Sequence, residues 1–403
     1  MRFPEFSGEW EKCKVSELLD FYSTNSLCWE QLEYDTENIS NLHYGLIHVG
    51  LPTMVNLVQD RLPNIKDGNK PKNYELCKEG DVAFADASED TNEVAKAIEF
   101  YNLNGRDVIC GLHTIHGRDN KDRTVVGFKG YAFSSTAFHN QIRRIAQGTK
   151  IYSISTKNFS ECYIGIPSKV EQAKIASLLH LIDERIVTQN KIIEDLKKLK
   201  SAISKYLFAR KDLLETTICL SNIATLKNGY AFQSGKYNAL GKWKILTITN
   251  VPGERYINDE DCNCIINLPN DIQDHQVLKE GDILISLTGN VGRVSLCKNG
   301  NYLLNQRVGL LQLAKNVNQE FLYQILSSQR FENSMIACGQ GAAQMNIGKG
   351  DVENYVLPYS SNGNNILFAA KILHSYDECI INELRRLTLL TMQKQYLLTQ
   401  MFI

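Results

Sequence analysis

Two long amphipathic segments of the chain match each other position by position. In the first, at about residues 170–206, apolar residues recur at the alternating spacing of three and four that is typical of a helix packed along one seam. An offset of 194 turns these positions into the apolar positions of the second segment, near the end of the chain. The matched seam residues are Leu179, Ile182, Ile186, Ile193, Leu196 and Ile203 in the first segment, and Leu373, Tyr376, Ile380, Leu387, Leu390 and Leu397 in the second.

Polar residues interrupt both seams at equivalent places, Gln189 and Lys200 in the first and Glu383 and Lys394 in the second. In an antiparallel pair, Lys200 is expected to face Glu383, and Gln189 to face Lys394, because buried polar residues often fix register. A helix of about 37 residues is roughly 55 Å long, too long to lie inside one ordinary domain. We therefore expect the two helices to pair as a spacer.

Shorter motifs show that the repeat extends beyond the helices. The tetrapeptide Lys-Glu-Gly-Asp stands at 78–81 and again at 279–282, and each copy precedes a short apolar run. This period is far longer than that of a solenoid, so it predicts a duplicated domain. We expect an α+β chain in which two mixed α/β domains with pseudo-two-fold symmetry are separated by a long antiparallel two-helix coiled coil. The expected boundaries are 1–165 for the first domain, 166–209 for the first helix, 210–358 for the second domain and 359–403 for the second helix.

Composition narrows the class of protein. A chain of 403 residues needs more than one core, and its net charge of −1 argues against a simple basic nucleic-acid-binding protein. The 11 cysteines include no Cys-x-x-Cys pair, so we expect reduced thiols and no zinc ribbon. The sequence shows no secretory signal and no apolar run near the ~20 residues that span a bilayer. A cytoplasmic protein without membrane contact is expected.

This layout resembles the specificity subunit of type I restriction–modification systems over essentially the whole chain. Ile166-Pro167 followed by Glu-Gln-Ala-Lys-Ile-Ala at 171–176 looks like the start of the family's first helix. The stretch at 80–90 resembles the strand and turn of one class of target recognition domain. Residues 281–284, together with Thr-Gly-Asn-Val-Gly-Arg at 288–293, resemble another class. The second helix start departs from the pattern because it lacks the Glu-Gln pair.

The resemblance implies a function. Each target recognition domain would read one half of a bipartite double-stranded DNA site, and the helix pair would set the gap between the halves. Two methyltransferase subunits would dock on the chain and methylate adenine with S-adenosylmethionine, which binds the methyltransferase, so the chain itself needs no cofactor. Restriction and translocase subunits would join for DNA cleavage.

Candidate DNA contacts are the basic and amide side chains in loop-like stretches, because these residue types read base edges and hold phosphates. The candidates are Arg118, Lys121, Arg123, Arg143, Arg144 and Lys150 in the first domain, and Lys227, Lys236, Lys244, Arg293, Arg307, Gln340, Gln344 and Asn346 in the second.

No catalytic constellation is visible in the sequence. The Pro-Pro pair of the adenine-methyltransferase tetrapeptide is absent, and no phosphate-binding loop has the right spacing. His113 and His116 lie three residues apart, but a polar loop is the more ordinary interpretation, so no metal site is expected. A non-catalytic DNA-binding subunit is therefore the favoured reading. The alternative is a coiled-coil scaffold that joins two protein-interaction domains without binding DNA.

Overall fold

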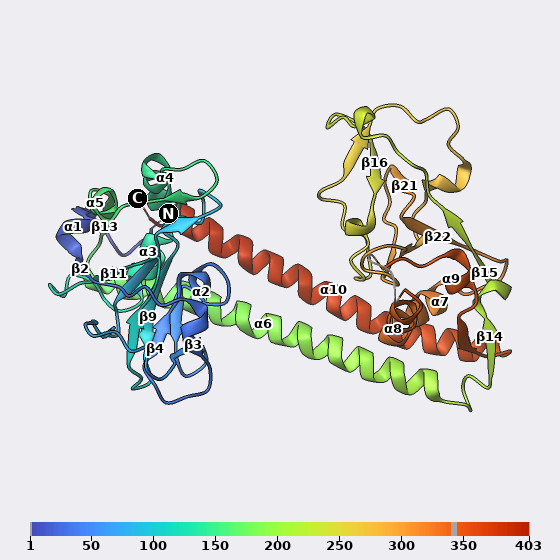
Figure 1. The fold of residues 1–403 in the computed structure, drawn as a ribbon, viewed down its shortest axis with the longest axis horizontal. Helices are drawn as coiled ribbons and strands as arrows, with labels where there is room; N and C mark the ends of the chain where they lie inside the picture. Colours follow the sequence, from blue (N-terminus) through green and yellow to red (C-terminus); the bar gives the residue numbers. More distant parts are fainter. Residues whose placement is uncertain (1, 340–344, 403) are drawn as a thin grey trace. The chain divides into compact units, whose positions relative to one another are not determined.

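The computed structural model describes residues 2–339 and 345–402 and divides the chain into two compact units. Unit 1 consists of residues 1–190 and 386–403, and unit 2 consists of residues 191–385. The two long helices, α6 (Lys169–Ala209) and α10 (Gly363–Gln400), each run from one unit into the other (Figure 1). Each unit therefore contains a globular part and a portion of both helices.

Unit 1 is built on a five-stranded sheet of order β2-β11-β7-β9-β5 and a four-stranded sheet of order β10-β4-β6-β3. Two ribbons, β1-β13 and β12-β8, complete it. Its strands are β1 (Glu11–Lys14), β2 (Asp20–Tyr22), β3 (Leu32–Glu33), β4 (Ser40–Leu42), β5 (Met54–Asn56), β6 (Asn64–Ile65), β7 (Val82–Ala85), β8 (Ala87–Ser88), β9 (Ala97–Asn102), β10 (Val108–Cys110), β11 (Thr114–Arg118), β12 (Tyr152–Ser153) and β13 (Tyr163–Ile166). Its shorter helices are α1 (Val15–Leu18), α2 (Tyr44–His48), α3 (Phe128–Phe133), α4 (Thr136–Ile145) and α5 (Thr156–Ser160).

Unit 2 contains two four-stranded sheets, of order β15-β22-β19-β20 and β17-β16-β21-β18, and the ribbon β14-β23. Its strands are β14 (Thr216–Cys219), β15 (Ala224–Asn228), β16 (Trp243–Leu246), β17 (Asn263–Ile265), β18 (Val277–Leu278), β19 (Ile283–Ser286), β20 (Val294–Leu296), β21 (Tyr302–Leu304), β22 (Val308–Leu313) and β23 (Val356–Tyr359). Its shorter helices are α7 (Gln319–Leu326), α8 (Gln329–Cys338) and α9 (Lys349–Glu353), which lie beside the first of these sheets (Figure 1).

The repeated tetrapeptide at 78–81 and 279–282 forms the same turn in both units. Its glycine has a φ of +86° in the first copy and +88° in the second, a conformation that glycine adopts without steric cost. The aspartate Oδ2 accepts the backbone N–H of the lysine at 2.9 Å in the first copy and 2.8 Å in the second. The tetrapeptide therefore has the same structural role in both units, which is to form this turn.

The sheets and helices of the two units correspond as well. Asn25 donates its backbone N–H to the carbonyl of Cys110, and Tyr230 donates to the carbonyl of Leu304, so β10 and β21 meet equivalent neighbours. Helices α4 and α8 begin in the same way, because Ser135 and Ser328 each cap the helix by accepting a backbone N–H from the phenylalanine three residues on. The predicted internal duplication and mixed α/β fold are confirmed.

Each unit packs its core against the long helices. In unit 1, Phe84, Phe133 and Phe159 form an aromatic cluster, with ring centroids 4.9 Å apart for Phe84–Phe133 and 4.6 Å for Phe84–Phe159. Leu179 of α6 and Leu397 of α10 belong to the same core. The core of unit 2 includes Leu207 of α6 and, from α10, Ile366, Ala369, Ala370 and Leu373. Every seam residue is buried or half-buried. Within the described residues, no helix is long and apolar enough to cross a membrane.

In unit 1, the two long helices are joined by an ion pair. Lys394 Nζ of α10 lies 2.6 Å from Asp183 Oδ1 of α6, and both side chains are mostly buried. Tyr131 donates its hydroxyl hydrogen to Asp183 at 2.8 Å, and its ring faces the ammonium group of Lys394 at 5.8 Å. Burial raises the pKa of Tyr131, so the phenol stays protonated and able to donate.

The same arrangement recurs in unit 2 with the helices exchanged. Lys200 Nζ of α6 lies 2.6 Å from Asp377 Oδ1 of α10, and the lysine faces the Tyr323 ring at 5.9 Å. Asp377 carries two further partners, since its Oδ2 accepts from Arg255 at 2.9 Å and from Gln324 at 2.6 Å. A single buried carboxylate therefore satisfies three side chains.

These ion pairs give the two seam lysines carboxylate partners that the sequence analysis did not predict. The seam spacing assigned Glu383 to Lys200 and Gln189 to Lys394, but the ion pairs join the lysines to Asp377 and Asp183. The two aspartates are themselves related by the offset of 194. Both lie just off the apolar seam, and a lysine side chain is long enough to reach such a position while its stem packs against apolar neighbours.

We predict that Asp377→Ala destabilises unit 2 by about 3–5 kcal/mol, because it leaves Lys200 and Arg255 buried without their shared carboxylate. Asp183→Ala should cost less, since it removes the partner of only one cation. Thermal unfolding followed by circular dichroism measures both. Glu194→Ala, which breaks an exposed pair within α6, is the control and should leave the transition unchanged. Equal transitions for Asp377→Ala and Glu194→Ala would contradict the assignment.

Candidate nucleic-acid interface

Four segments of unit 2 meet at one end of its β15-β22-β19-β20 sheet, and we call them the loop end of unit 2: residues 228–230, 287–293, 305–307 and 345–347. The strand directions bring them together. Strand β22 runs antiparallel to both β15 and β19, so the segments after β15 and β19 lie at the end where β22 begins. Strand β20 is antiparallel to β19 and begins there too.

Backbone hydrogen bonds tie these segments to one another. Leu287 donates its N–H to the carbonyl of Arg307 at 3.0 Å, and Ile347 donates to the carbonyl of Leu287 at 2.9 Å. Gln306 donates to the carbonyl of Tyr230 at 3.0 Å. Main-chain hydrogen bonds thus hold these loops together.

The exposed side chains of this loop end are of the types that read nucleic-acid bases. Asn290, Gln306, Arg307 and Asn346 are all exposed. Asn346 Oδ1 accepts a hydrogen bond from Thr288 at 3.0 Å, which fixes the orientation of the amide and leaves its N–H donors pointing away. Guanidinium and amide groups offer the paired donors and acceptors that match guanine and adenine edges.

Other predicted residues of unit 2 lie close to this end. Lys227 is half-buried on β15, and Arg293 precedes β20 and contacts Glu332, with Nε 3.4 Å from the carboxylate. Lys236 is exposed and lines a cavity of about 440 Å³ whose wall includes Phe232. The predicted residues Gln340 and Gln344 lie outside the described residues.

The predicted contact residue Lys244 forms an ion pair within unit 2. Its Nζ lies 2.6 Å from Asp259 Oδ2 and 3.0 Å from the Asp259 carbonyl. The hydrogen bond to Asp259 raises the pKa of Lys244, and Lys298 and Tyr302 bind the same carboxylate. Lys244 is therefore part of a polar network in the second sheet, although its side chain is 40% exposed.

Unit 1 has an equivalent loop end, formed by residues 23–25, 86–96, 111–113 and 147–154. Asp86 donates its N–H to the carbonyl of His113 at 3.1 Å, and Ile154 donates to the carbonyl of Asp86 at 3.0 Å. These bonds repeat the bonds of Leu287 in unit 2. By this correspondence, His113 occupies the position of Arg307.

Of the basic residues predicted near 143–150, Lys150 lies within the loop end of unit 1 and Arg143 contacts it. Arg143 is exposed on α4 and donates from Nη1 to Asn92 Oδ1 at 2.7 Å, which connects the helix to the 86–96 loop. Arg144 and Lys150 are also exposed. Lys150 lies within the loop that leads to β12.

Arg118 does not belong to a DNA-facing surface, contrary to the sequence-based expectation. It is only 6% exposed and donates from Nε and Nη2 to the Asp81 carboxylate and from Nη1 to Glu75 at 2.6 Å. Hydrogen bonds to Asp81 raise the pKa of Arg118. The charge is neutralised inside unit 1, so Arg118 has a structural role.

Lys121 and Arg123 follow β11, whereas the loop end of unit 1 lies where β11 begins. Lys121 donates to the Glu17 carbonyl at 2.8 Å, and Arg123 forms an ion pair with Glu11 at 2.6 Å. The structure therefore separates these two residues from Arg143 and Lys150, although the sequence analysis grouped all four as candidates.

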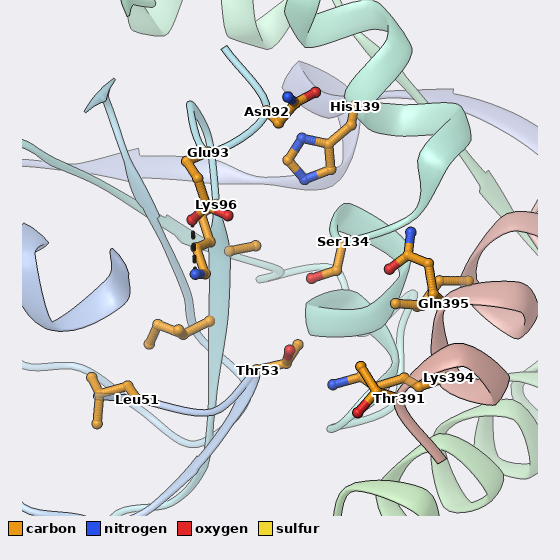
Figure 2. Close-up of a pocket in the computed structure, with 13 residues that line it drawn as sticks. Leu51, Thr53, Asn92, Glu93, Lys96, Ser134, His139, Thr391, Lys394 and Gln395 are labelled. Atoms are coloured by element: carbon orange, nitrogen blue, oxygen red, sulfur yellow. Dashed lines mark ion pairs between the residues drawn. The ribbon is translucent and has the colours of Figure 1, made fainter. Parts of the chain in front are cut away.

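A cavity of about 330 Å³ borders the loop end of unit 1, and Figure 2 shows the residues that line it. Its walls come from the 86–96 loop, α4 and the last turns of α10. The two lysines in its wall are both held by carboxylates, Lys96 by Glu93 at 2.8 Å and Lys394 by Asp183 at 2.6 Å. The wall is thus close to electrically balanced and does not favour an anion.

The part of the chain that includes the loop end of unit 2 is similar to a known protein family. Residues 215–391 match the family model of the type I restriction modification DNA specificity domain. This part of the chain is similar to that family. It contains the ribbon β14-β23, both sheets of unit 2 and the loop end, together with much of α10.

A curated protein is also similar in sequence to part of this chain. The type I restriction enzyme MjaVIII specificity subunit of Methanocaldococcus jannaschii is 29% identical over 213 residues. The match covers 47% of this chain and 49% of the relative, so the chain spans about half the length of that protein in the alignment.

Solved structures of the family share the fold. The S subunit of a type I restriction-modification system from M. genitalium matches with a TM-score of 0.56 and 17% identity, over 100% of this chain and 99% of that chain. A chain from a structure of the assembly and conformational transition of the type I R-M system matches with a TM-score of 0.60 and 15% identity, covering 98% and 97%. The family resemblance inferred from the sequence is confirmed.

Sequence reasoning missed two exposed residues of the loop end of unit 2, Asn290 and Gln306. Asn290 lies within the 288–293 motif, directly after Gly289, whose φ of +74° marks a tight turn. Gln306 directly precedes the predicted Arg307. For Asn290 the available signal was an amide residue directly after a turn glycine, but only the strand pairing shows that Asn290 and Gln306 reach the same end.

We predict that Arg118→Ala destabilises unit 1 by about 3 kcal/mol, because it removes the guanidinium that donates to the buried Asp81 carboxylate. Arg144→Ala, at an exposed site on α4, should leave stability unchanged. Urea unfolding of the two variants makes the comparison. A destabilised Arg144→Ala beside a native-like Arg118→Ala would reverse our assignment.

Proposed function

We propose that this chain is the DNA-reading specificity subunit of a type I restriction–modification complex and that each loop end reads one half of a bipartite target. The observation that carries the proposal is the loop end of unit 2, where Arg307, Asn346 and Gln306 are exposed within a DNA specificity domain. The equivalent loop end of unit 1 supplies a second, chemically different reader. Two related readers with different side chains suit a target whose two halves differ in sequence.

The charge of the chain fits local contacts. A net charge of −1 gives little long-range attraction for DNA, so affinity must come from the loop ends and from partner subunits. In this proposal Arg307 reads a base edge, while Lys227, Lys236 and Lys150 contact phosphates. Phosphate contacts position the protein, and base contacts provide the specificity.

The long helices support a partner that covers them. Several large apolar side chains are exposed on each of the two helices, and exposed apolar surface is typical of protein interaction sites. They are Leu181, Val187, Ile192 and Leu199 on α6, and Leu384, Leu389, Met392 and Tyr396 on α10. We propose that adenine methyltransferase subunits dock there and supply the catalysis, with S-adenosylmethionine bound by the methyltransferase. Restriction and translocase subunits complete the assembly.

Arg307→Ala, measured in the reconstituted complex with its methyltransferase, should weaken binding to the cognate DNA by about 1–3 kcal/mol and relax specificity at one base position. The matched control is Lys315→Ala, because Lys315 is exposed but follows β22 at the end opposite to Arg307. Fluorescence anisotropy on cognate and single-mismatch duplexes is the measurement. If both variants bind all duplexes as the wild type does, Arg307 is not a base reader.

Deleting this gene from a strain that keeps the methyltransferase gene should remove methylated adenine from one split sequence motif. Single-molecule sequencing of genomic DNA measures the change, and restoring the wild-type gene is the control. An unchanged methylome, with the methyltransferase expressed, would favour a coiled-coil scaffold that does not bind DNA. Binding of the purified complex to DNA over a range of salt separates the two, because only DNA binding releases counterions.

A further inference from the structure

Three side chains of metal-ligand type meet in the interior of unit 1. Cys77 precedes the turn at 78–81, Cys110 ends β10, and His116 lies in β11, so the three come from separate parts of the sequence. They are only 5%, 2% and 1% exposed, and one donor atom from each lies within 4.8 Å of the others. The structure also corrects the expectation of a polar loop for His116, which is a buried strand residue.

The separation of the two sulfur atoms suits a shared metal ion. Cys77 Sγ and Cys110 Sγ are 3.6 Å apart. A disulfide needs about 2.05 Å, so the sulfurs are not bonded to each other. Two thiolates that bind one tetrahedral zinc ion at about 2.3 Å each lie roughly 3.8 Å apart. The sulfurs can therefore take up zinc with a shift of a few tenths of an ångström.

His116 has the hydrogen-bonding pattern of a metal ligand. His116 Nε2 lies 2.7 Å from Asp81 Oδ2, and Arg118 holds the same carboxylate. His116 Nδ1 is buried and has no hydrogen-bond partner among the described residues. Metal-binding histidines commonly use one ring nitrogen as the ligand while a carboxylate holds the other and fixes the ring. A buried nitrogen without a partner is costly, and coordination of an ion removes that cost.

The second copy of the fold shows how the same three positions are filled without a metal. The turn motif relates Cys77 to Leu278, since the two residues directly precede 78–81 and 279–282. Cys110 pairs with Leu42 of β4, as Leu304 pairs with Leu246 of β16, so Cys110 corresponds to Leu304.

The strand register identifies the residue of unit 2 that corresponds to His116. His116 pairs with Ala83 of β7, and Leu310 pairs with Leu284 of β19 at the equivalent position. The three counterparts Leu278, Leu304 and Leu310 all belong to one hydrophobic cluster of unit 2. Where unit 2 has three packed leucines, unit 1 thus has two thiols and an imidazole. Leucines would fill this space in unit 1 as well, so packing alone does not explain the thiols and the imidazole.

We propose that Cys77, Cys110 and His116 bind a zinc ion inside unit 1. The donor set of two sulfurs and one imidazole nitrogen is the set that Zn²⁺ favours among common cellular cations. Two thiolates cancel the charge of the ion, so the bound site is neutral and can be buried. Water or another small ligand takes the fourth tetrahedral position.

The position of the ion gives it a structural role. Cys110 directly precedes the 111–113 segment of the loop end of unit 1, and Cys77 precedes the turn into β7. A zinc ion ties these two segments to β11 and fixes the base of the 111–113 loop. This inference is independent of DNA binding, because it concerns only the interior of unit 1.

The test uses the full chain purified without metal-affinity resin. Elemental analysis should find about one zinc ion per chain after dialysis, and replacement by Co²⁺ should give the near-ultraviolet thiolate-to-cobalt charge-transfer band of a tetrahedral site. Cys110→Ser should abolish the band and most of the bound zinc. Asp81→Asn should weaken zinc affinity by about 10–100-fold while the band remains at saturating Co²⁺.

The double variant Cys262→Ser with Cys264→Ser is the matched control, because it removes two neighbouring cysteines of unit 2 and should keep the full zinc content. If Cys110→Ser does not fold, the triple variant Cys77→Leu, Cys110→Leu and His116→Leu copies the packing of unit 2 and should fold without zinc. Wild-type chain that holds neither zinc nor a Co²⁺ charge-transfer band overturns the proposal, as does a disulfide between Cys77 and Cys110 detected by mass spectrometry.

Discussion

A buried aspartate–lysine pair between the two long helices recurs in both halves of this molecule, and the packing of each half depends on it. In unit 1 the aspartate Asp183 is on α6 and the lysine Lys394 on α10, and in unit 2 Lys200 is on α6 and Asp377 on α10. Removing one partner of such a pair leaves an uncompensated charge in the interior, which costs more than the intact pair contributes. Because of the two pairs, a substitution of the aspartate or the lysine on one helix leaves an uncompensated charge on the other helix.

The sequence was sufficient to predict the duplication, the two long helices and the family, because each rests on a repeated pattern of residues. It was not sufficient for side-chain partners. The sequence pattern identified Lys200 and Lys394 as polar interruptions of the seam. It did not identify their aspartate partners, because the long lysine side chain reaches a residue that lies off the seam. Arg118 and Lys244 looked like DNA contacts, and only the fold reveals the buried and half-buried carboxylates that hold them.

The two loop ends illustrate how one scaffold supports two different surfaces. Backbone hydrogen bonds at Asp86 and Leu287 are the same in both units, whereas the exposed side chains differ, with His113 in one place and Arg307 in the other. Main-chain bonding makes the loop geometry independent of most side chains. Substitutions at such exposed positions can alter the chemistry of the surface at little cost to stability.

Unit 1 is assembled from the two extremes of the chain. The last residues, Leu397, Leu398, Met401 and Phe402, are buried in its core, and the Phe402 ring lies 6.1 Å from that of Trp10. Unit 2, by contrast, is one continuous stretch. During synthesis, the half whose residues leave the ribosome first is therefore the half that is completed last. Until the final turn of α10 has been synthesised, part of the core of unit 1 stays exposed to solvent. All residues of unit 2 have been synthesised by then.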